Sequence, residues 1–174
     1  PLKLASRDQV AGAISKAACD TGHRSLSLAF LLSEWDQVVD AWQIKGWEAY
    51  RDVVRLGRKT RLREDKRQTL WAVFEATQRE LGGEGMLTEA GMFAGLAAAV
   101  ASARNPPYTA AVIDEAQDVS VQQLRFFAAL GGAKPNALFF AGDLGQRIFQ
   151  QPFSWTSLGV DVRGRARTLR VNYR

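Results

Sequence analysis

The chain has 174 residues, of which 47% are hydrophobic and 24% are charged, proportions typical of a folded globular protein rather than a disordered one. It has 23 Lys or Arg against 18 Asp or Glu, so its formal net charge is +5 and an anionic partner is favoured. One cysteine and one histidine exclude an intrachain disulfide and argue against a zinc site, and we expect a reducing, cytoplasmic location. No apolar run approaches the roughly 18 residues of a membrane span, so no membrane partner is expected.

Helical periodicity dominates the first hundred residues. Ser6 is a capping residue before a helix that is predicted to reach Cys19, and Thr21–His23 is predicted to end it. Residues 25–32 fit either a short strand or a buried helix. Further helices are predicted over residues 34–50, 68–81 and 88–103, with the glycine-rich segment 82–85 between the last two.

The segment 51–67 is the most basic part of the chain, with eight Lys or Arg against three acids, and it is flanked by Trp47 and Trp71. One interpretation is a nucleic-acid surface whose cations contact backbone phosphates. The alternative is a solvated helix face with both tryptophans in the core. The candidate nucleic-acid residues in this segment are Arg58, Lys59, Arg61 and Arg63. A second basic group, which could serve the same groove, comprises Arg163, Arg165, Arg167 and Arg170.

The pattern changes after Asn105-Pro106-Pro107, because paired prolines cannot continue a helix. We therefore expect a mostly helical subdomain over residues 1–105 and a second domain over 106–174. Short apolar runs at 108–113 and 137–141 enclose a predicted helix at 121–130, and 168–171 is a third candidate strand. Continuously apolar strands around a helix predict an α/β fold with a parallel sheet covered on both faces.

Two adjacent carboxylates, Asp114 and Glu115, follow the first apolar run. In parallel sheets, ligands bind outside the carboxyl ends of the strands. One acid there can hold hydrated Mg²⁺ while the other polarises an attacking water. The alternative, an acidic helix N-terminus favoured by the helix dipole, would explain a bare Asp-Glu pair but is disfavoured for the whole string Asp114–Asp118.

Two further polar segments follow the later apolar runs. Gly142–Phe149 comes about thirty residues after the first acidic turn, an interval that suits one strand–helix–strand unit, so the two turns should meet in space. Gln146 could hydrogen-bond a phosphate or a water, although an ordinary loop with a turn-forming Asp is the alternative. Asn172-Tyr173-Arg174 ends the chain, and an arginine there could stabilise charge on a transferring phosphoryl group.

Taken in order, these three segments resemble the UvrD/Rep-like branch of superfamily one DNA helicases. Asp114–Asp118 resembles the family's Walker B element (motif II), Gly142–Phe149 resembles motif III, and Asn172–Arg174 resembles the start of motif IV. The resemblance is specific over residues 108–174, whereas residues 1–105 match only in their position before motif II, where the family has a helical insert that contacts DNA. It implies a partial RecA-like core of the P-loop NTPase type over residues 106–174.

The resemblance also implies roles for individual residues. Asp114, with Glu115 beside it, would bind Mg²⁺, and Glu115 would activate the hydrolytic water. Gln146 would sense the γ-phosphate of ATP and couple it to DNA, and Arg174 would contact the same phosphate. The implied partners are ATP and single-stranded DNA or a duplex junction.

The sequence departs from the family in two respects. No Gly-Lys-Thr or Gly-Lys-Ser occurs, so the Walker A loop is absent, and the isolated chain should lack ATPase activity. Motif III is followed by Gln150–Trp155 instead of the family's usual aromatic-Arg-Gly segment, so Phe153 or Trp155 would supply the aromatic that stacks on a base. The start at Pro1 and the stop at Arg174 suggest a segment of a longer protein, whose missing strands would leave sheet edges prone to dimerisation.

Three functions are therefore compared. The first, which we prefer, is a segment of an ATP-dependent DNA helicase. The second is a stand-alone, non-catalytic module derived from a helicase, which would bind DNA or a protein. The third is a metal-dependent nuclease built from Asp114, Glu115, Asp118 and Asp143, for which the sequence offers no partnering lysine or histidine.

Overall fold

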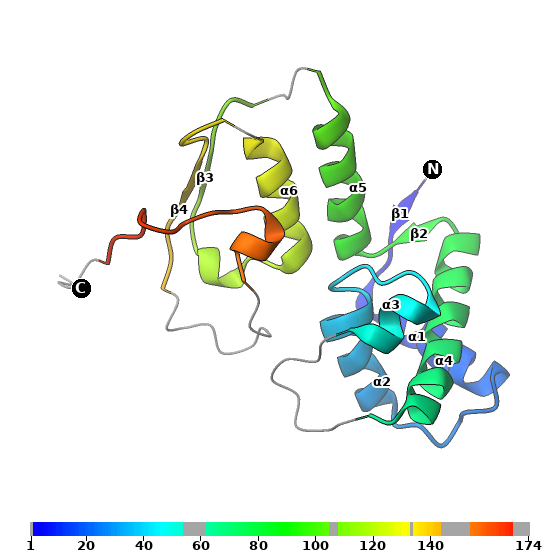
Figure 1. Cartoon of the computed structure of the whole chain (residues 1–174). Helices are drawn as coiled ribbons and strands as arrows, with labels where there is room; N and C mark the ends of the chain where they lie inside the picture. The colour runs from blue at the N-terminus through cyan, green and yellow to red at the C-terminus, as the bar shows by residue number, and fades with distance from the viewer. Residues whose placement is uncertain (1, 54–61, 105–107, 133, 144–153, 169–174) are drawn as a thin grey trace, which may run out of the picture.

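The computed structural model describes residues 2–53, 62–104, 108–132, 134–143 and 154–168. The chain order is β1 (Lys3–Leu4), α1 (Arg7–Asp20), α2 (Leu28–Glu34), the π-helix η1 (Trp35–Val39), α3 (Trp47–Asp52), α4 (Glu64–Gly83), β2 (Met86–Leu87), α5 (Glu89–Ser102), β3 (Ala111–Ile113), the 3₁₀ helix η2 (Ala116–Asp118), α6 (Val121–Gly131), β4 (Leu138–Phe140) and η4 (Thr156–Leu158). The fold is therefore α/β, with helices predominating in the first half, as the sequence predicted (Figure 1).

Local capping fixes the helix starts. Ser6 accepts a hydrogen bond from the backbone of Gln9, whose side chain reaches back to Ser6, and Ser120 and Gln123 repeat this capping box at α6. Capping satisfies backbone N–H groups that a helix start leaves without partners. The predicted helices 6–19, 68–81, 88–103 and 121–130 are confirmed with small shifts of their ends.

Two expectations for residues 25–50 are resolved by the structure. In the ambiguous segment 25–32, residues 28–32 form the first part of helix α2 and no strand, because the apolar run packs into the helical core. The continuous helix predicted over 34–50 is wrong. The chain widens into the π-helix η1 and then leaves helical geometry until Gly46, whose φ of 105° favours glycine, caps α3.

The first hydrophobic cluster lies among α1, α2, η1, α3 and α4. Tyr50 and Phe74 are fully buried at its centre with their rings edge to face, and Trp71 stacks on Tyr50. The Tyr50 hydroxyl donates to the buried Glu34 carboxylate over 2.8 Å. The short sheet β1–β2, which the sequence did not predict, pairs Lys3 with Met86 in parallel and so ties the start of the chain to the end of α4.

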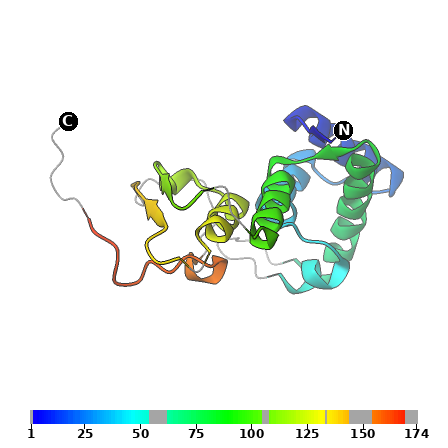
Figure 2. The ribbon, with the colours of Figure 1, turned by 90° about the horizontal axis from the view of Figure 1, so that it is seen from above.

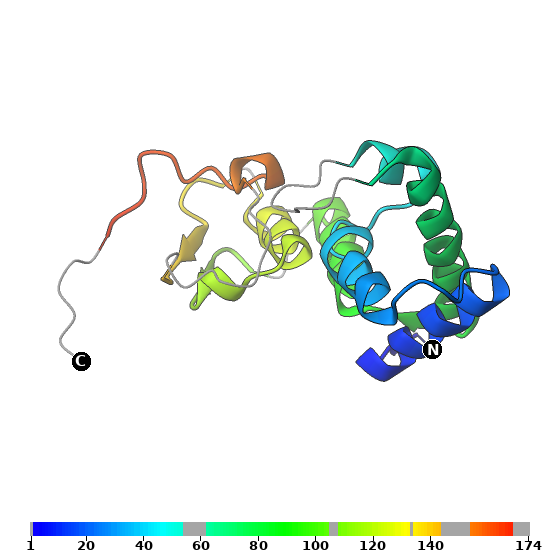
Figure 3. The same ribbon diagram turned by 90° about the horizontal axis from the view of Figure 1, so that it is seen from below.

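The second cluster forms around β3, β4 and α6. The strands pair in parallel with Ala111 opposite Leu138 and Ile113 opposite Phe140, which confirms a parallel sheet. Helix α6 and η4 cover one face of these strands (Figure 3). Leu124 of α6 is fully buried in this cluster. The expected cover on both faces is wrong for the described residues, because Val112 and Phe139 on the opposite face are 77% and 62% exposed.

Helix α5 joins the two clusters. It lies alongside α6 in all three ribbon views (Figures 1, 2 and 3). The Phe93 ring of α5 packs on the Phe126 ring of α6. From α6, the buried Gln122 side chain donates to the Ala41 carbonyl over 3.0 Å, and the Arg125 guanidinium lies over the Trp42 ring. These contacts fix α6, and hence the sheet on which it packs, relative to the helical part. Among the described residues, no helix is both long and apolar enough to cross a bilayer.

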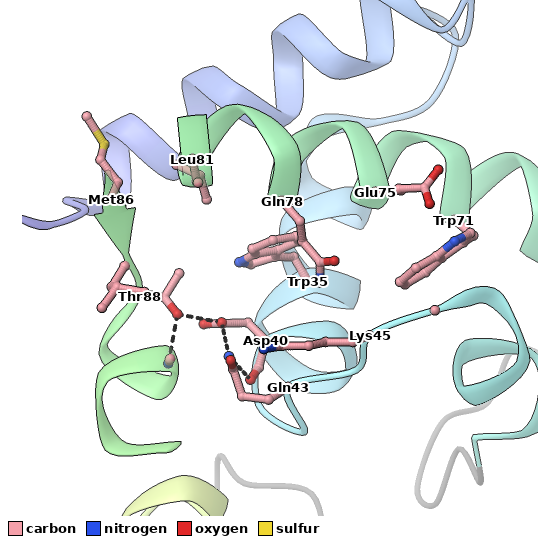
Figure 4. A pocket seen from close by; sticks show the side chains of 14 residues that line it. Trp35, Asp40, Gln43, Lys45, Trp71, Glu75, Gln78, Leu81, Met86 and Thr88 are labelled. Atoms are coloured by element: carbon pink, nitrogen blue, oxygen red, sulfur yellow. Dashed lines mark hydrogen bonds between the residues drawn. The ribbon is translucent and has the colours of Figure 1, made fainter. Parts of the chain in front are cut away.

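A cavity of about 320 Å³ opens beside η1, α4 and the start of α5, and Trp35 and Trp71 form part of its wall (Figure 4). The Asp40 carboxylate accepts hydrogen bonds there from Thr88 Oγ1 at 2.6 Å and from Gln43 Nε2 at 2.7 Å. Because Thr88 also caps α5, this carboxylate connects η1 to the helix that joins the two clusters. Burial raises the pKa of Asp40 to about 6, although the two hydrogen bonds oppose the rise.

The raised pKa of Asp40 predicts a pH-dependent stability. The folded chain holds this proton more tightly than the unfolded chain, whose carboxyl has an ordinary pKa of 3.8. The contribution of Asp40 to stability is therefore present at low pH and is lost as pH rises through about 6. In urea titrations, the unfolding free energy of the native chain should decrease from pH 5 to pH 7.5. In the Asp40→Asn variant this decrease should be smaller, because residue 40 no longer titrates. Replacing the exposed Asp20 by Asn should leave that slope unchanged, and an equal slope in the Asp40 variant would contradict the assignment.

Candidate phosphate-facing site at the ends of the parallel strands

The acidic turn begins directly after β3. Ile113 is buried in the sheet, and the next two residues, Asp114 and Glu115, are exposed at the carboxyl end of the strand. The Glu115 backbone N–H donates to Asp114 Oδ1 over 2.9 Å. Glu115 itself has φ 50° and ψ 42°, the left-handed conformation that non-glycine residues rarely adopt. This backbone reverses the chain from β3 into η2, so that two consecutive carboxylates are presented at one strand end.

The turn after β4, residues 141–143, contacts the acidic turn, residues 114–118. We call the first of these the Gly142 turn or the β4 turn. The Ala116 N–H donates to the Ala141 carbonyl over 2.8 Å, and the Asp143 N–H donates to Gln117 Oε1 over 3.0 Å. These bonds confirm that the two strand-end turns lie together in space. Parallel pairing produces this outcome, because it places both carboxyl ends at the same edge of the sheet.

Gln117 occupies the space between the two turns. The residue is only 5% exposed. Its Nε2 donates to Glu115 Oε2 over 2.5 Å, while its Oε1 accepts the Asp143 N–H. The buried amide therefore has partners on both of its polar atoms, as buried polar groups require, and it links the Glu115 carboxylate to the β4 turn.

Gly142 is required by this close approach. A Cβ built at Gly142 would lie 2.4 Å from Gln117 Oε1 and 2.7 Å from the Ala116 nitrogen. Both distances are far shorter than van der Waals contact, and one neighbour is backbone that cannot rotate away. Any side chain at this position would push the β4 turn off the acidic turn.

The two exposed carboxylates fit a magnesium–nucleotide site. Mg²⁺ in nucleotide sites is typically held by one or two carboxylates together with phosphate oxygens and waters. Asp114 Oδ1 and Glu115 Oε2 each accept one protein hydrogen bond, and both carboxylates remain exposed. Within the part of the chain that the structure describes, no three His, Cys, Asp or Glu side chains cluster as a metal site. The four carboxylates of the nuclease alternative therefore do not converge as that hypothesis requires.

The two described candidate nucleic-acid residues belong to different parts of the chain, Arg63 to the helical part and Trp155 to the second cluster. Arg63 is exposed directly before α4, in the basic segment. Trp71 is buried and Trp47 packs against the helical core, as expected if the basic segment is a solvated face with both tryptophans inside. Trp155 is partly buried, and its ring meets Phe140 edge to face at 4.8 Å.

Several predicted residues and segments lie outside the described residues. They are Gln146, Arg174, Phe153, Arg58, Lys59, Arg61, the Asn105–Pro107 boundary and most of the third candidate strand. Their roles remain predictions from the sequence.

Comparison with known protein families identifies the family of the chain. The family model for the UvrD/REP helicase N-terminal domain matches residues 58–152, more than half of the chain. The chain belongs to the UvrD/Rep helicase family. The match spans the acidic turn, α6, β4 and the Gly142 turn. The segment that matches the family therefore includes both turns of the candidate site. No curated protein and no solved structure matches the chain significantly.

Sequence reasoning did not assign a role to Gln117. The residue was part of the quoted Asp114–Asp118 string, but only the carboxylates in it received a function. The signal that was available is its position two residues after Glu115, where an amide can serve as both donor and acceptor. A long polar side chain between a buried strand and a helix needs partners nearby, and here the two turns supply them.

Replacing Gly142 by Ala should separate the two turns. The methyl group would overlap Gln117 and the backbone of Ala116, and we expect a loss of about 1–3 kcal/mol in unfolding free energy. The matched control is Gly95→Ala in α5, where an added Cβ meets nothing within 4 Å and should be neutral or stabilise by roughly 0.5–1 kcal/mol. Equal unfolding midpoints for the native chain and the Gly142 variant would contradict the close approach.

Proposed function

We propose that the chain is the segment of an ATP-dependent DNA helicase that carries the Mg²⁺- and water-facing part of the ATP site. The observation that carries this proposal is the meeting of the acidic turn and the Gly142 turn at one edge of a parallel sheet, in a chain of the UvrD/Rep helicase family. The intact protein, which we call the parent helicase, would couple ATP hydrolysis to movement on single-stranded DNA. A RecA-like core over residues 106–174 and a helical insert over residues 1–105 are parts of the same proposal.

The two carboxylates would have different roles, one in binding Mg²⁺ and the other in activating water. Asp114 is the side chain we assign to Mg²⁺, with Glu115 beside it, and the bound ion would neutralise charge on the phosphates. Glu115 would orient the attacking water and accept its proton, because its carboxylate is exposed and its position is held by Gln117. Gln146 and Arg174 are assigned to the γ-phosphate of ATP by the family resemblance.

DNA contact is assigned to the basic segment before α4 and to an aromatic side chain after motif III. Arg63 and its neighbours Arg58, Lys59 and Arg61 supply positive charge for backbone phosphates. Phe153 and Trp155 are the candidates for stacking on a base, and Phe153 is favoured, since the Trp155 ring packs on Phe140.

ATP hydrolysis tests the carboxylate assignment. In the parent helicase, Glu115→Gln should lower the DNA-stimulated kcat by about 10²–10⁴-fold, the usual contribution of a positioned base, while ATP binding persists. Replacing the exposed Glu84 by Gln is the matched control and should leave kcat unchanged. The isolated chain should show no hydrolysis, because the sequence has no Walker A lysine. Full activity of the Glu115 variant, or Glu115-dependent hydrolysis by the chain alone, would contradict this proposal.

Salt-dependent DNA binding tests the basic segment. Changing Arg58, Lys59, Arg61 and Arg63 together to Gln should weaken binding of a labelled single-stranded oligonucleotide, measured by fluorescence anisotropy. If all four contact phosphates, the slope of log K against log salt concentration should become shallower by about 3. A control that neutralises four exposed cations elsewhere, Lys3, Arg24, Arg79 and Lys134, removes the same net charge. Equal slopes in the two variants would show that only net charge matters and that the basic segment is not the DNA surface.

A further inference from the structure

We infer that Gln117 is a positioning residue that couples the Glu115 carboxylate to the Gly142–Asp143 turn. An effect of Gln117 on ATP hydrolysis rests on the proposed function. The hydrogen bonds that link Gln117 to Glu115 and to Asp143 do not depend on that function. Gln117 is not assigned a contact with the nucleotide or with the attacking water. It acts through Glu115, whose carboxylate it holds at one end of its amide.

The first step is the geometry of the amide. A Gln side chain offers one carbonyl acceptor and one NH₂ donor, which lie in the same rigid plane on either side of the Cδ atom. In this chain, the donor side is 2.5 Å from Glu115 Oε2 and the acceptor side is 3.0 Å from the Asp143 nitrogen. A displacement of the β4 turn therefore pulls on the same planar group that orients the carboxylate.

The Gln117 side chain is confined by its neighbours. Gln117 is 5% exposed, and the α-carbon of Gly142 leaves no room for even a methyl group beside its Oε1. On the far side, the Ala116 N–H is fixed by the Ala141 carbonyl at 2.8 Å. Because the amide cannot rotate into solvent without losing both bonds, the position of the Glu115 carboxylate depends on the position of the turn.

The third step is the backbone of Glu115. Its left-handed conformation is unusual for a residue with a side chain and persists only where surrounding contacts hold it. The hydrogen bond from Gln117 is one such contact, and the bond from the Glu115 N–H to Asp114 is another. Loss of the Gln117 amide should release the Glu115 side chain while leaving the strand pairing of β3 and β4 intact.

The consequence is a route for communication within the ATP site. A change in the β4 turn would be passed through Gln117 to the group that orients the water. Gln117 would thus make hydrolysis sensitive to the state of the segment that follows β4.

The coupling is testable in this chain without ATP. In the Gln117→Met variant, the Asp143 amide loses its acceptor, and its hydrogen exchange measured by NMR should become at least about tenfold faster. The Ala116 and Ala141 amides, which bond to backbone carbonyls, should exchange as in the native chain. Gln78→Met is the matched control, because the half-buried Gln78 amide bonds to the Ile44 carbonyl within the helical part, and this change should leave exchange at Asp143 as in the native chain. Unchanged exchange at Asp143, or equal acceleration at all three amides, would overturn the inference.

The catalytic meaning is tested in the parent helicase. Gln117→Met should lower kcat by about 10–100-fold with the KM for ATP within about twofold of native, since a misplaced base weakens the chemical step and not binding. In a Glu115→Gln background, the same change should have no further effect on kcat. A loss that adds fully to that of Glu115→Gln would overturn the inference. If Glu115→Gln alone leaves kcat unchanged, the proposed function fails, while the exchange result still decides the coupling.

Discussion

Parallel pairing of β3 with β4 is the constraint on which the candidate site depends. It places the carboxyl ends of both strands at one edge, and just past the strands the Ala116 N–H donates to the Ala141 carbonyl. The acidic turn and the Gly142 turn then share one buried amide, Gln117. An antiparallel pairing of the same two segments would put the turns at opposite ends of the sheet and would separate the groups that the proposed chemistry requires.

The strands themselves depend on α6 and on the helices behind it. Three-residue strands form too small a sheet to be stable alone, and their buried face is supplied by α6 and η4. Gln122 and Arg125 then anchor α6 to the loop after η1, and α5 packs along its side. The helical part therefore contributes to the site indirectly, by fixing the helix on which the sheet rests.

Sequence patterns predicted the elements with strong local signals and the meeting of the two turns. Ser6 marked a helix start, and apolar runs ending in polar turns marked β3 and β4. The patterns failed where nonlocal packing decides, as in the π-helix at Trp35–Val39 and the break before Gly46. The β1–β2 pairing joins residues more than eighty positions apart and left no local trace. Gln117 was overlooked because its role arises only when the β4 turn packs against it.

The most direct test of the central claim is a crystal structure of the parent helicase with Mg²⁺ and a non-hydrolysable ATP analogue. We expect the metal against Asp114, with Glu115 and Gln146 both facing the terminal phosphate of the analogue and Gln117 still bridging Glu115 to Asp143. A structure in which Glu115 and Gln146 lie on opposite rims of the sheet, or in which the terminal phosphate is distant from both, would contradict it.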